Sequence, residues 1–196
     1  LNEKYFTDNN LVIWDADTIP IKKIKFFDQN NQPYIYGSGY EYHLPYFYTI
    51  KKLLGQNCSL LNLSCITQFV ALNLKNRKDL RSFFLKLNSF YKIKNDHFFV
   101  ANALLKTLSI STNSSSLIES KFSEYEFIGN FILNKYKKSK KEQKRIKFFR
   151  NYVDGNLNII QKNILYCLNY KHLTYENIWE KNFYYRSWRI YWKSPK

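Results

Sequence analysis

The sequence has 196 residues and a mass of 23.8 kDa, a length typical of one domain. Its 31 Lys and Arg against 15 Asp and Glu give a formal net charge of +16, and 45% of the residues are hydrophobic, which excludes an intrinsically disordered chain. Three cysteines are too few for a disulfide-rich scaffold, and no apolar stretch reaches the roughly 18 residues that would cross a bilayer. From its length we expect a single domain, residues 1–196. Because no basic-then-apolar signal peptide opens the chain, we expect it in the reducing cytoplasm.

The first half of the chain contains short apolar runs separated by turn residues. Residues 11–14 predict a buried strand, and residues 19–26 predict an extended segment, since Pro20 disfavours a helix there. A further strand is expected at 34–36, a helix at 46–54 before Gly55, and a second core strand at 66–72.

Helical periodicity is clearest in the middle of the chain. Residues 78–91 carry apolar side chains at spacings of three and four, and a second helix is expected at 96–108. After a polar loop at 109–116, Ser123 and Glu126 form the Ser-x-x-Glu pattern that begins a helix.

The last part predicts a helix at 157–168 and a strand-like aromatic tail at 183–192. Strands and helices alternate along the whole chain. The sequence therefore predicts an α/β domain, with a sheet flanked by helices.

Half of the excess positive charge lies in residues 135–150, which hold nine basic residues and one Glu, whereas residues 1–50 are net negative by two charges. Such a run is typical of a solvated helix or loop. The alternatives are an anionic membrane surface and nucleic acid. Phe148, Phe149 and Tyr152 beside the run either bury at a lipid interface or start a strand.

Asp15 and Asp17 follow the predicted strand at 11–14. If the chain stays extended, both carboxylates leave the same face, because strand side chains alternate with a period of two. Paired carboxylates bind Mg²⁺ or Mn²⁺ together with the phosphates of a substrate. The alternative is a turn in which the Asp side chains cap nearby backbone amides.

Residues 11–36 (LVIWDADTIPIKKIKFFDQNNQPYIY) resemble the strand–DxD–strand core of bacterial nucleotide-diphospho-sugar transferases with the GT-A fold. Residues 42–47 (YHLPYF), 66–70 (ITQFV) and 122–130 (FSEYEFIGN) resemble, in the same order, blocks of an uncharacterised glycosyltransferase-like family in that superfamily. The resemblance covers roughly residues 8 to 135, and the block at 122–130 is its most specific part.

The resemblance implies a GT-A-like, Rossmann-like mixed sheet and a glycosyltransferase that takes a sugar from a nucleotide-sugar donor. It also implies that Trp14, Asp15 and Asp17 lie at the nucleotide diphosphate, with both Asp residues as ligands of Mn²⁺ or Mg²⁺. Such enzymes begin with strands that bind the base, whereas fourteen residues precede Asp15 and the chain has no Met. We therefore expect a chain that starts within a longer protein, and a fragment that is inactive alone if the base-binding strands are missing.

Catalysis of an inverting transfer needs a carboxylate that takes the proton of the attacking hydroxyl. Glu126 is the first candidate and Glu124 its rival, about 200° away around the predicted helix. The alternative for Glu126 is a purely structural role in the capping box with Ser123.

Other candidate site residues are isolated in the sequence. His43 and Tyr42 lie in a polar aromatic stretch that suits stacking on the sugar of an acceptor, although a packed His is the commoner arrangement. His172 is the one candidate for a third metal ligand. Cys58, Cys65 and Cys167 lack the spacing of a zinc site, which favours packing roles.

The sequence thus predicts a metal-dependent glycosyltransferase of polysaccharide biosynthesis, acting on a polysaccharide, lipopolysaccharide or lipid-linked acceptor. The basic run and aromatic tail would suit peripheral contact with the inner face of an anionic membrane. Nucleic acid is not the expected partner. The alternatives are a basic nucleic-acid-binding module and a metal-dependent phosphate hydrolase that uses the same two Asp residues.

Overall fold

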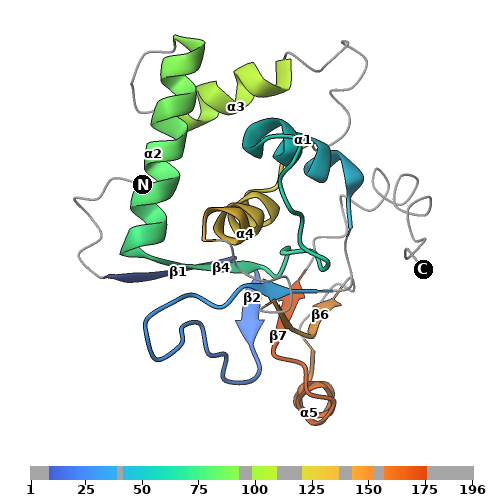
Figure 1. The fold of residues 1–196 in the computed structure, drawn as a ribbon. Helices are drawn as coiled ribbons and strands as arrows, with labels where there is room; N and C mark the ends of the chain where they lie inside the picture. The colour runs from blue at the N-terminus through green and yellow to red at the C-terminus, as the bar shows by residue number, and fades with distance from the viewer. Residues whose placement is uncertain are drawn as a thin grey trace.

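The computed structural model describes residues 9–38, 42–92, 99–109, 121–136, 143–151 and 157–175, which form a mixed α/β structure (Figure 1). The strands are β1 (Asn10–Trp14), β2 (Thr18–Pro20), β3 (Tyr36–Gly37), β4 (Phe69–Asn73), β5 (Lys144–Arg145), β6 (Phe148–Asn151) and β7 (His172–Tyr175). The helices are α1 (Leu44–Leu54), α2 (Leu74–Tyr91), α3 (Phe99–Ser109), α4 (Glu124–Lys135) and α5 (Ile159–Cys167). The predicted α/β class is therefore confirmed.

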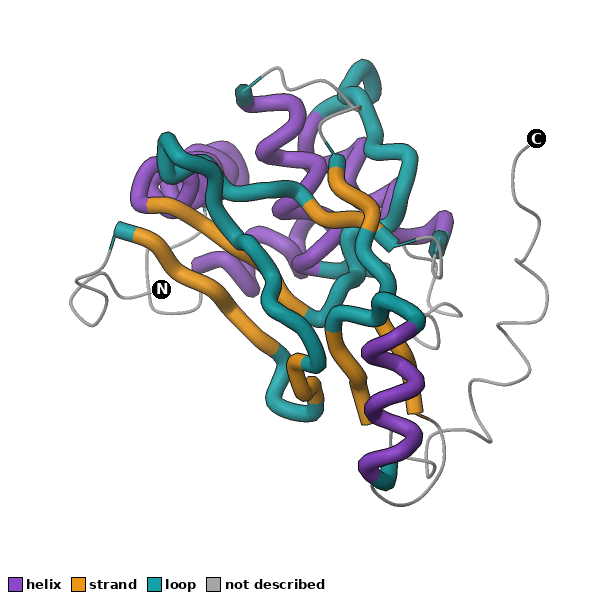
Figure 2. Tube along the Cα trace, turned by 90° about the horizontal axis from the view of Figure 1, so that it is seen from below, coloured by secondary structure: helices purple, strands orange, loops and turns teal. Residues whose placement is uncertain are grey.

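The described strands form three small sheets. β1 pairs antiparallel with β4, and β3 pairs parallel with β5. In the third sheet, of order β2-β7-β6, the central strand β7 is antiparallel to β2 and parallel to β6. The helices α1 to α4 lie on one side of these strands, and α5 lies at the opposite end of the molecule (Figures 1 and 2).

The hydrophobic core lies between the helices and the β1–β4 pair. Phe127 and Phe131 of α4 pack their rings against Phe83 and Phe84 of α2. The buried aliphatic side chains around them include Ile50, Leu53, Leu61, Leu72, Ile132 and Leu133. Among the described residues no helix is long and apolar enough to cross a membrane.

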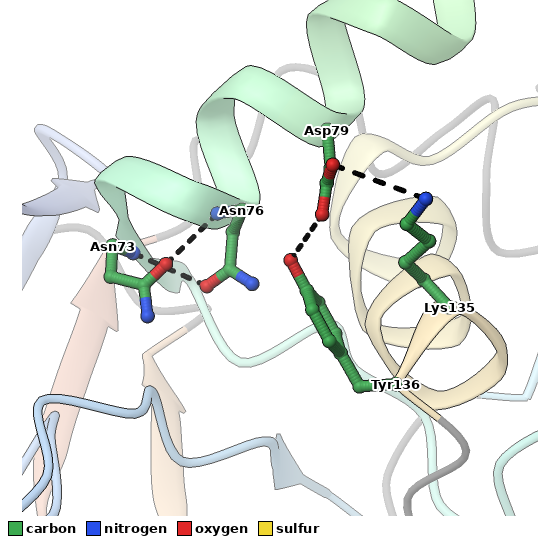
Figure 3. A network of polar contacts seen from close by, with 5 residues as sticks. All are labelled: Asn73, Asn76, Asp79, Lys135 and Tyr136. Carbon is green, nitrogen blue, oxygen red and sulfur yellow. Dashed lines mark hydrogen bonds and ion pairs between the residues drawn. The ribbon is translucent and has the colours of Figure 1, made fainter.

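The helix expected at 78–91 begins four residues earlier, because Asn73 caps it. The Asn73 side chain accepts a hydrogen bond from the Asn76 backbone N–H at 2.9 Å, and the Asn76 side chain accepts one from the Asn73 N–H at 3.3 Å. Figure 3 shows this reciprocal pair at the start of α2. The capping box thus forms with Asn at both positions.

Figure 3 also shows how α2 is joined to the end of α4. The Tyr136 hydroxyl donates to Asp79 Oδ2 at 2.6 Å, and Lys135 Nζ lies 3.9 Å from Asp79 Oδ1. Burial, together with this hydrogen bond to a carboxylate, raises the pKa of Tyr136 to about 12. The contact fixes the C-terminal end of α4 against α2.

The segment before β4 packs tightly on α4. A side chain at Gly129 would meet Cys65 Sγ at 2.3 Å, so only glycine allows this approach. The neighbouring Asn130 Oδ1 accepts from the Leu61 N–H at 2.8 Å, and Asn134 Oδ1 accepts from the Ser59 N–H at 2.8 Å. Gly129 and Asn130 of the 122–130 block therefore have a packing role.

Other sequence predictions differ in their bounds or lie outside the described residues. Cys58, Cys65 and Cys167 are free thiols: Cys65 is buried in the core, Cys58 is half-buried and Cys167 is exposed. The described residues of the basic run at 135–150 belong to the end of α4, to β5 and to β6. Phe148 is a buried residue of strand β6. Residues 137–142 and Tyr152 lie outside the described residues. The same holds for most of the polar loop at 109–116 and for the aromatic tail at 183–192.

Candidate functional site

The chain turns sharply where β1 ends, at the two predicted ligands. The Asp15 N–H donates to the Gln68 carbonyl at 3.0 Å, and the Thr18 N–H donates back to the Asp15 carbonyl at 3.1 Å. Residues 15–18 thus form a turn rather than an extended strand, which corrects the argument from strand alternation. The Thr18 hydroxyl donates to Asp17 Oδ1 at 3.2 Å, whereas the turn alternative has the Asp side chains capping backbone amides.

Two side chains from distant parts of the chain hold the Asp15 carboxylate. The Tyr125 hydroxyl in the first turn of α4 donates to Asp15 Oδ1. The Gln68 side-chain amide can be oriented to bond both Asp15 and Arg150. In that orientation its nitrogen donates to Asp15 Oδ2, and its oxygen accepts from Arg150 Nη2 at 2.9 Å. Asp15 is therefore fixed in one orientation.

Gln68 reaches Asp15 from an unusual backbone conformation. Its φ of 63° lies in the left-handed region, which non-glycine residues rarely adopt. This kink lies immediately before β4 and lets the Gln68 carbonyl and amide both face Asp15. Such strain is concentrated at functional sites.

Two further carboxylates, of Asp17 and Glu124, lie near enough to Asp15 for their charges to act on it. Asp15 is half-buried, whereas Asp17 and Glu124 are exposed. Burial raises the pKa of Asp15, the Tyr125 hydrogen bond lowers it, and the negative charges of Asp17 and Glu124 raise it further. The positive charge of Arg150 already offsets part of this repulsion by lowering the pKa of Asp15, and a bound cation would offset more of it.

Trp14 supports the turn from inside the molecule. Its ring stacks on Phe69 with centroids 5.4 Å apart, and its Nε1 donates to the Thr18 carbonyl at 2.7 Å. The half-buried indole therefore has a structural role. A contact between Trp14 and a nucleotide stays a prediction.

His172, the expected third ligand, lies in an aromatic cluster. Its fully buried imidazole stacks on Phe148 at 4.9 Å and meets Trp14 and Phe69 edge-on. The described residues contain no group of three His, Cys, Asp or Glu side chains able to hold a metal ion. The structure thus does not join His172 to Asp15 and Asp17 in a three-ligand site.

We expect His172 to make folding sensitive to acid. Burial lowers its pKa to about 4, against about 6.5 in the unfolded chain, so the unfolded state binds the proton first. This contribution to stability is complete above pH 6.5, and about 3 kcal/mol is lost as the pH falls from 6.5 to 4. Urea unfolding between pH 6.5 and pH 4 measures this loss of unfolding free energy, and His172→Phe should remove it. A variant that loses as much stability as the original chain over this range would contradict the role of His172.

The other predicted residues form a separate group. Glu126 is completely buried. Burial of Cys65 and of Tyr42, and secondly the negative charge of Glu126, raise the pKa of both groups. Tyr42 stacks on Phe47 at 4.3 Å, and His43 precedes α1 with its ring 4.5 Å from Tyr46. The described structure therefore joins Glu124, rather than Glu126, to the Asp pair.

Sequence reasoning missed Tyr125, Gln68 and Arg150. Tyr125 lies in the 122–130 block, between the two candidate Glu residues, and Gln68 lies in the 66–70 block. Their place in blocks that resemble the glycosyltransferase-like family is the one feature of the sequence that could have indicated them. Arg150 is one of the nine basic residues of the 135–150 run, and the sequence does not distinguish it from the others.

We expect Tyr125→Phe to weaken Mn²⁺ binding about 10-fold or more, because partners that orient a ligand typically contribute 10–100-fold. Loss of the donor also raises the pKa of Asp15, so binding should need a higher pH. Tyr136→Phe removes a matched Tyr–Asp bond at the end of α4 and should leave binding unchanged. Calorimetric titration at several pH values tests this; equal effects of both variants contradict it.

Comparison with known proteins gives no match, whether with family models, curated proteins or solved structures.

Proposed function

We propose that this chain is a metal-dependent glycosyltransferase of the GT-A type that moves a sugar from a nucleotide-diphosphate donor to a glycan or lipid-linked acceptor. The observation that carries the proposal is the convergence of three sequence blocks on one carboxylate. Asp15 belongs to the first block, Gln68 to the block at 66–70 and Tyr125 to the block at 122–130. Residues up to 110 positions apart are thus in contact at the DxD motif.

The donor set fits a hard divalent cation. Asp15 and Asp17 offer carboxylate oxygens, and Mg²⁺ in proteins is commonly held by one or two carboxylates, with waters and substrate phosphates completing the shell. Tyr125 and Gln68 orient the Asp15 carboxylate, as hydrogen-bonded neighbours of metal ligands do. When bound, the metal would neutralise charge on the departing diphosphate.

For the proton of the acceptor hydroxyl, the proposal favours Glu124 over Glu126. Glu124 is exposed in the first turn of α4, next to the residue that contacts Asp15. Glu126 is completely buried and near Cys65 and Tyr42, where an acceptor would have to displace packed side chains to reach it. A base must lie within hydrogen-bond reach of the proton that it takes.

The test is calorimetry of UDP and Mn²⁺ on the full chain, followed by ³¹P NMR with a panel of nucleotide sugars. A transferase should bind the nucleotide only with the metal and release a nucleoside diphosphate when a glycan or lipid-linked acceptor is present. Formation of a nucleoside monophosphate and a sugar phosphate from the nucleotide sugar, or of inorganic phosphate from UDP, would instead indicate a hydrolase. Salt-sensitive retention on DNA that survives Asp15→Ala and Asp17→Ala, with no UDP binding, would indicate a nucleic-acid-binding module.

A further inference from the structure

The helix α5 exposes its apolar side chains instead of burying them. Ile159, Ile160 and Ile164 are between 53% and 75% exposed, and Leu168 just after the helix is 56% exposed. At about 100° per residue, the three isoleucines span an arc of about 140° whose centre lies roughly opposite Leu165. Leu165 is the one buried residue of the helix.

A nine-residue helix with one buried side chain needs other support, because short helices are marginal in water. Asn158 and Gln161 form a capping box with both hydrogen bonds at 2.9 Å, and the Tyr170 N–H donates to the Leu165 carbonyl at 3.0 Å. These contacts fix both ends of α5. The helix is therefore held in place with its apolar face directed outward.

Several lysines lie on α5 or on the segments next to it. Lys22 Nζ lies 4.2 Å from the centre of the Tyr166 ring and donates to Asn169 Oδ1 at 3.3 Å. Lys162 is on the helix, and Lys147 and Lys171 are joined through a backbone hydrogen bond of 2.9 Å. The described segments joined to residues 171–174 by backbone hydrogen bonds, residues 18–22 and 147–151, contain no Asp or Glu, and neither does the segment 157–175 itself.

We propose that α5 and the surrounding lysines form a surface that docks on an anionic lipid bilayer. Exposed isoleucines with lysines beside them match the pattern of a helix that lies in the membrane interface, with its apolar face among the acyl chains and lysines at the headgroups. Nucleic acid fits less well, since its recognition uses donors and aromatic stacking rather than aliphatic side chains. The inference does not depend on the proposed sugar transfer.

The position of α5 suits this role. It lies at the end of the molecule opposite α2 and α3 and protrudes beyond the strands (Figure 1), and Figure 2 shows it in front when the molecule is seen from below. A flat surface can therefore approach α5 without meeting the other helices. If the proposed function also holds, the same docking would bring the enzyme to a lipid-linked acceptor.

The test is sedimentation of the full chain with vesicles of phosphatidylcholine, with and without phosphatidylglycerol. We expect binding to the anionic vesicles that weakens with salt. Ile160→Asn with Ile164→Asn should lower the partition coefficient at least about 10-fold, because both side chains leave the acyl region. Lys147→Gln and Lys162→Gln should each lower it about fivefold.

Phe90→Asn is the matched control, since Phe90 is 77% exposed on α2, at the other end of the molecule. It should leave vesicle binding unchanged, and circular dichroism should show all variants folded. Absence of binding to anionic vesicles would overturn the proposal. Vesicle binding by the isoleucine variant that equals binding by the original chain would also overturn it, because binding would then depend on net charge alone. A dimer of the original chain that the isoleucine variant does not form would overturn it as well, because the apolar face of α5 would then bind a second copy of the chain.

Discussion

Asp17→Asn should lower the affinity for Mn²⁺ with UDP by at least about 100-fold. Even residues that only orient a metal ligand contribute about 10–100-fold, and Asp17 is proposed as a ligand itself. The asparagine retains an oxygen that can accept the Thr18 hydroxyl hydrogen bond, so the turn at 15–18 should persist. Calorimetry of the variant, with its thermal unfolding as a check on folding, measures the effect.

Asp79→Asn is the control for the same change of charge. Asp79 accepts a hydrogen bond from Tyr136 and lies near Lys135, at the junction of α2 and α4. Its replacement should affect stability by about 1 kcal/mol and leave Mn²⁺ affinity unchanged. Binding to Asp17→Asn that equals binding to the original chain would refute the role of Asp17.

Phe127→Ala should have the largest effect on stability, with a loss of about 3–5 kcal/mol. Phe127 is almost completely buried, and its ring packs against four others: Phe83, Phe84, Phe122 and Phe131. Removing it leaves a cavity where α4 meets α2. Because domains of this size have a total stability of about 5–15 kcal/mol, the variant should be close to unfolding.

The same substitution at Phe90, which is exposed on α2, provides the comparison. Phe90→Ala should change the free energy of unfolding by less than about 0.5 kcal/mol. Urea unfolding of both variants separates the two cases. A loss below about 1 kcal/mol for Phe127→Ala would contradict the position of the core between α4 and α2.

Local signals predicted the helices well. The Ser123 cap and the spacing of apolar residues before Tyr91 are features of a few neighbouring residues, and α4 and α2 form where these signals lie. The start of α2 was misplaced because Asn73 and Asn76 replace the usual residues of the capping box.

Contacts between distant residues were not predictable in this way. The turn at 15–18 depends on the Gln68 carbonyl, and the orientation of Asp15 depends on Tyr125, 110 residues away. The periodicity of residues 157–168 predicted a helix correctly, but it did not reveal that the apolar face of α5 is directed outward. Sequence spacing defines which residues share a face, and only tertiary packing decides what that face meets.

Paramagnetic NMR of the labelled full chain with Mn²⁺ and UDP would locate a bound cation directly. If a cation is held by the turn after β1, the signals of Asp15, Asp17 and the neighbouring Tyr125 should broaden first, and EDTA should restore them. Signals of Phe90 and of α5 should persist at the same Mn²⁺ concentration. Broadening that begins elsewhere, or a spectrum that Mn²⁺ and UDP leave unchanged, would contradict the account.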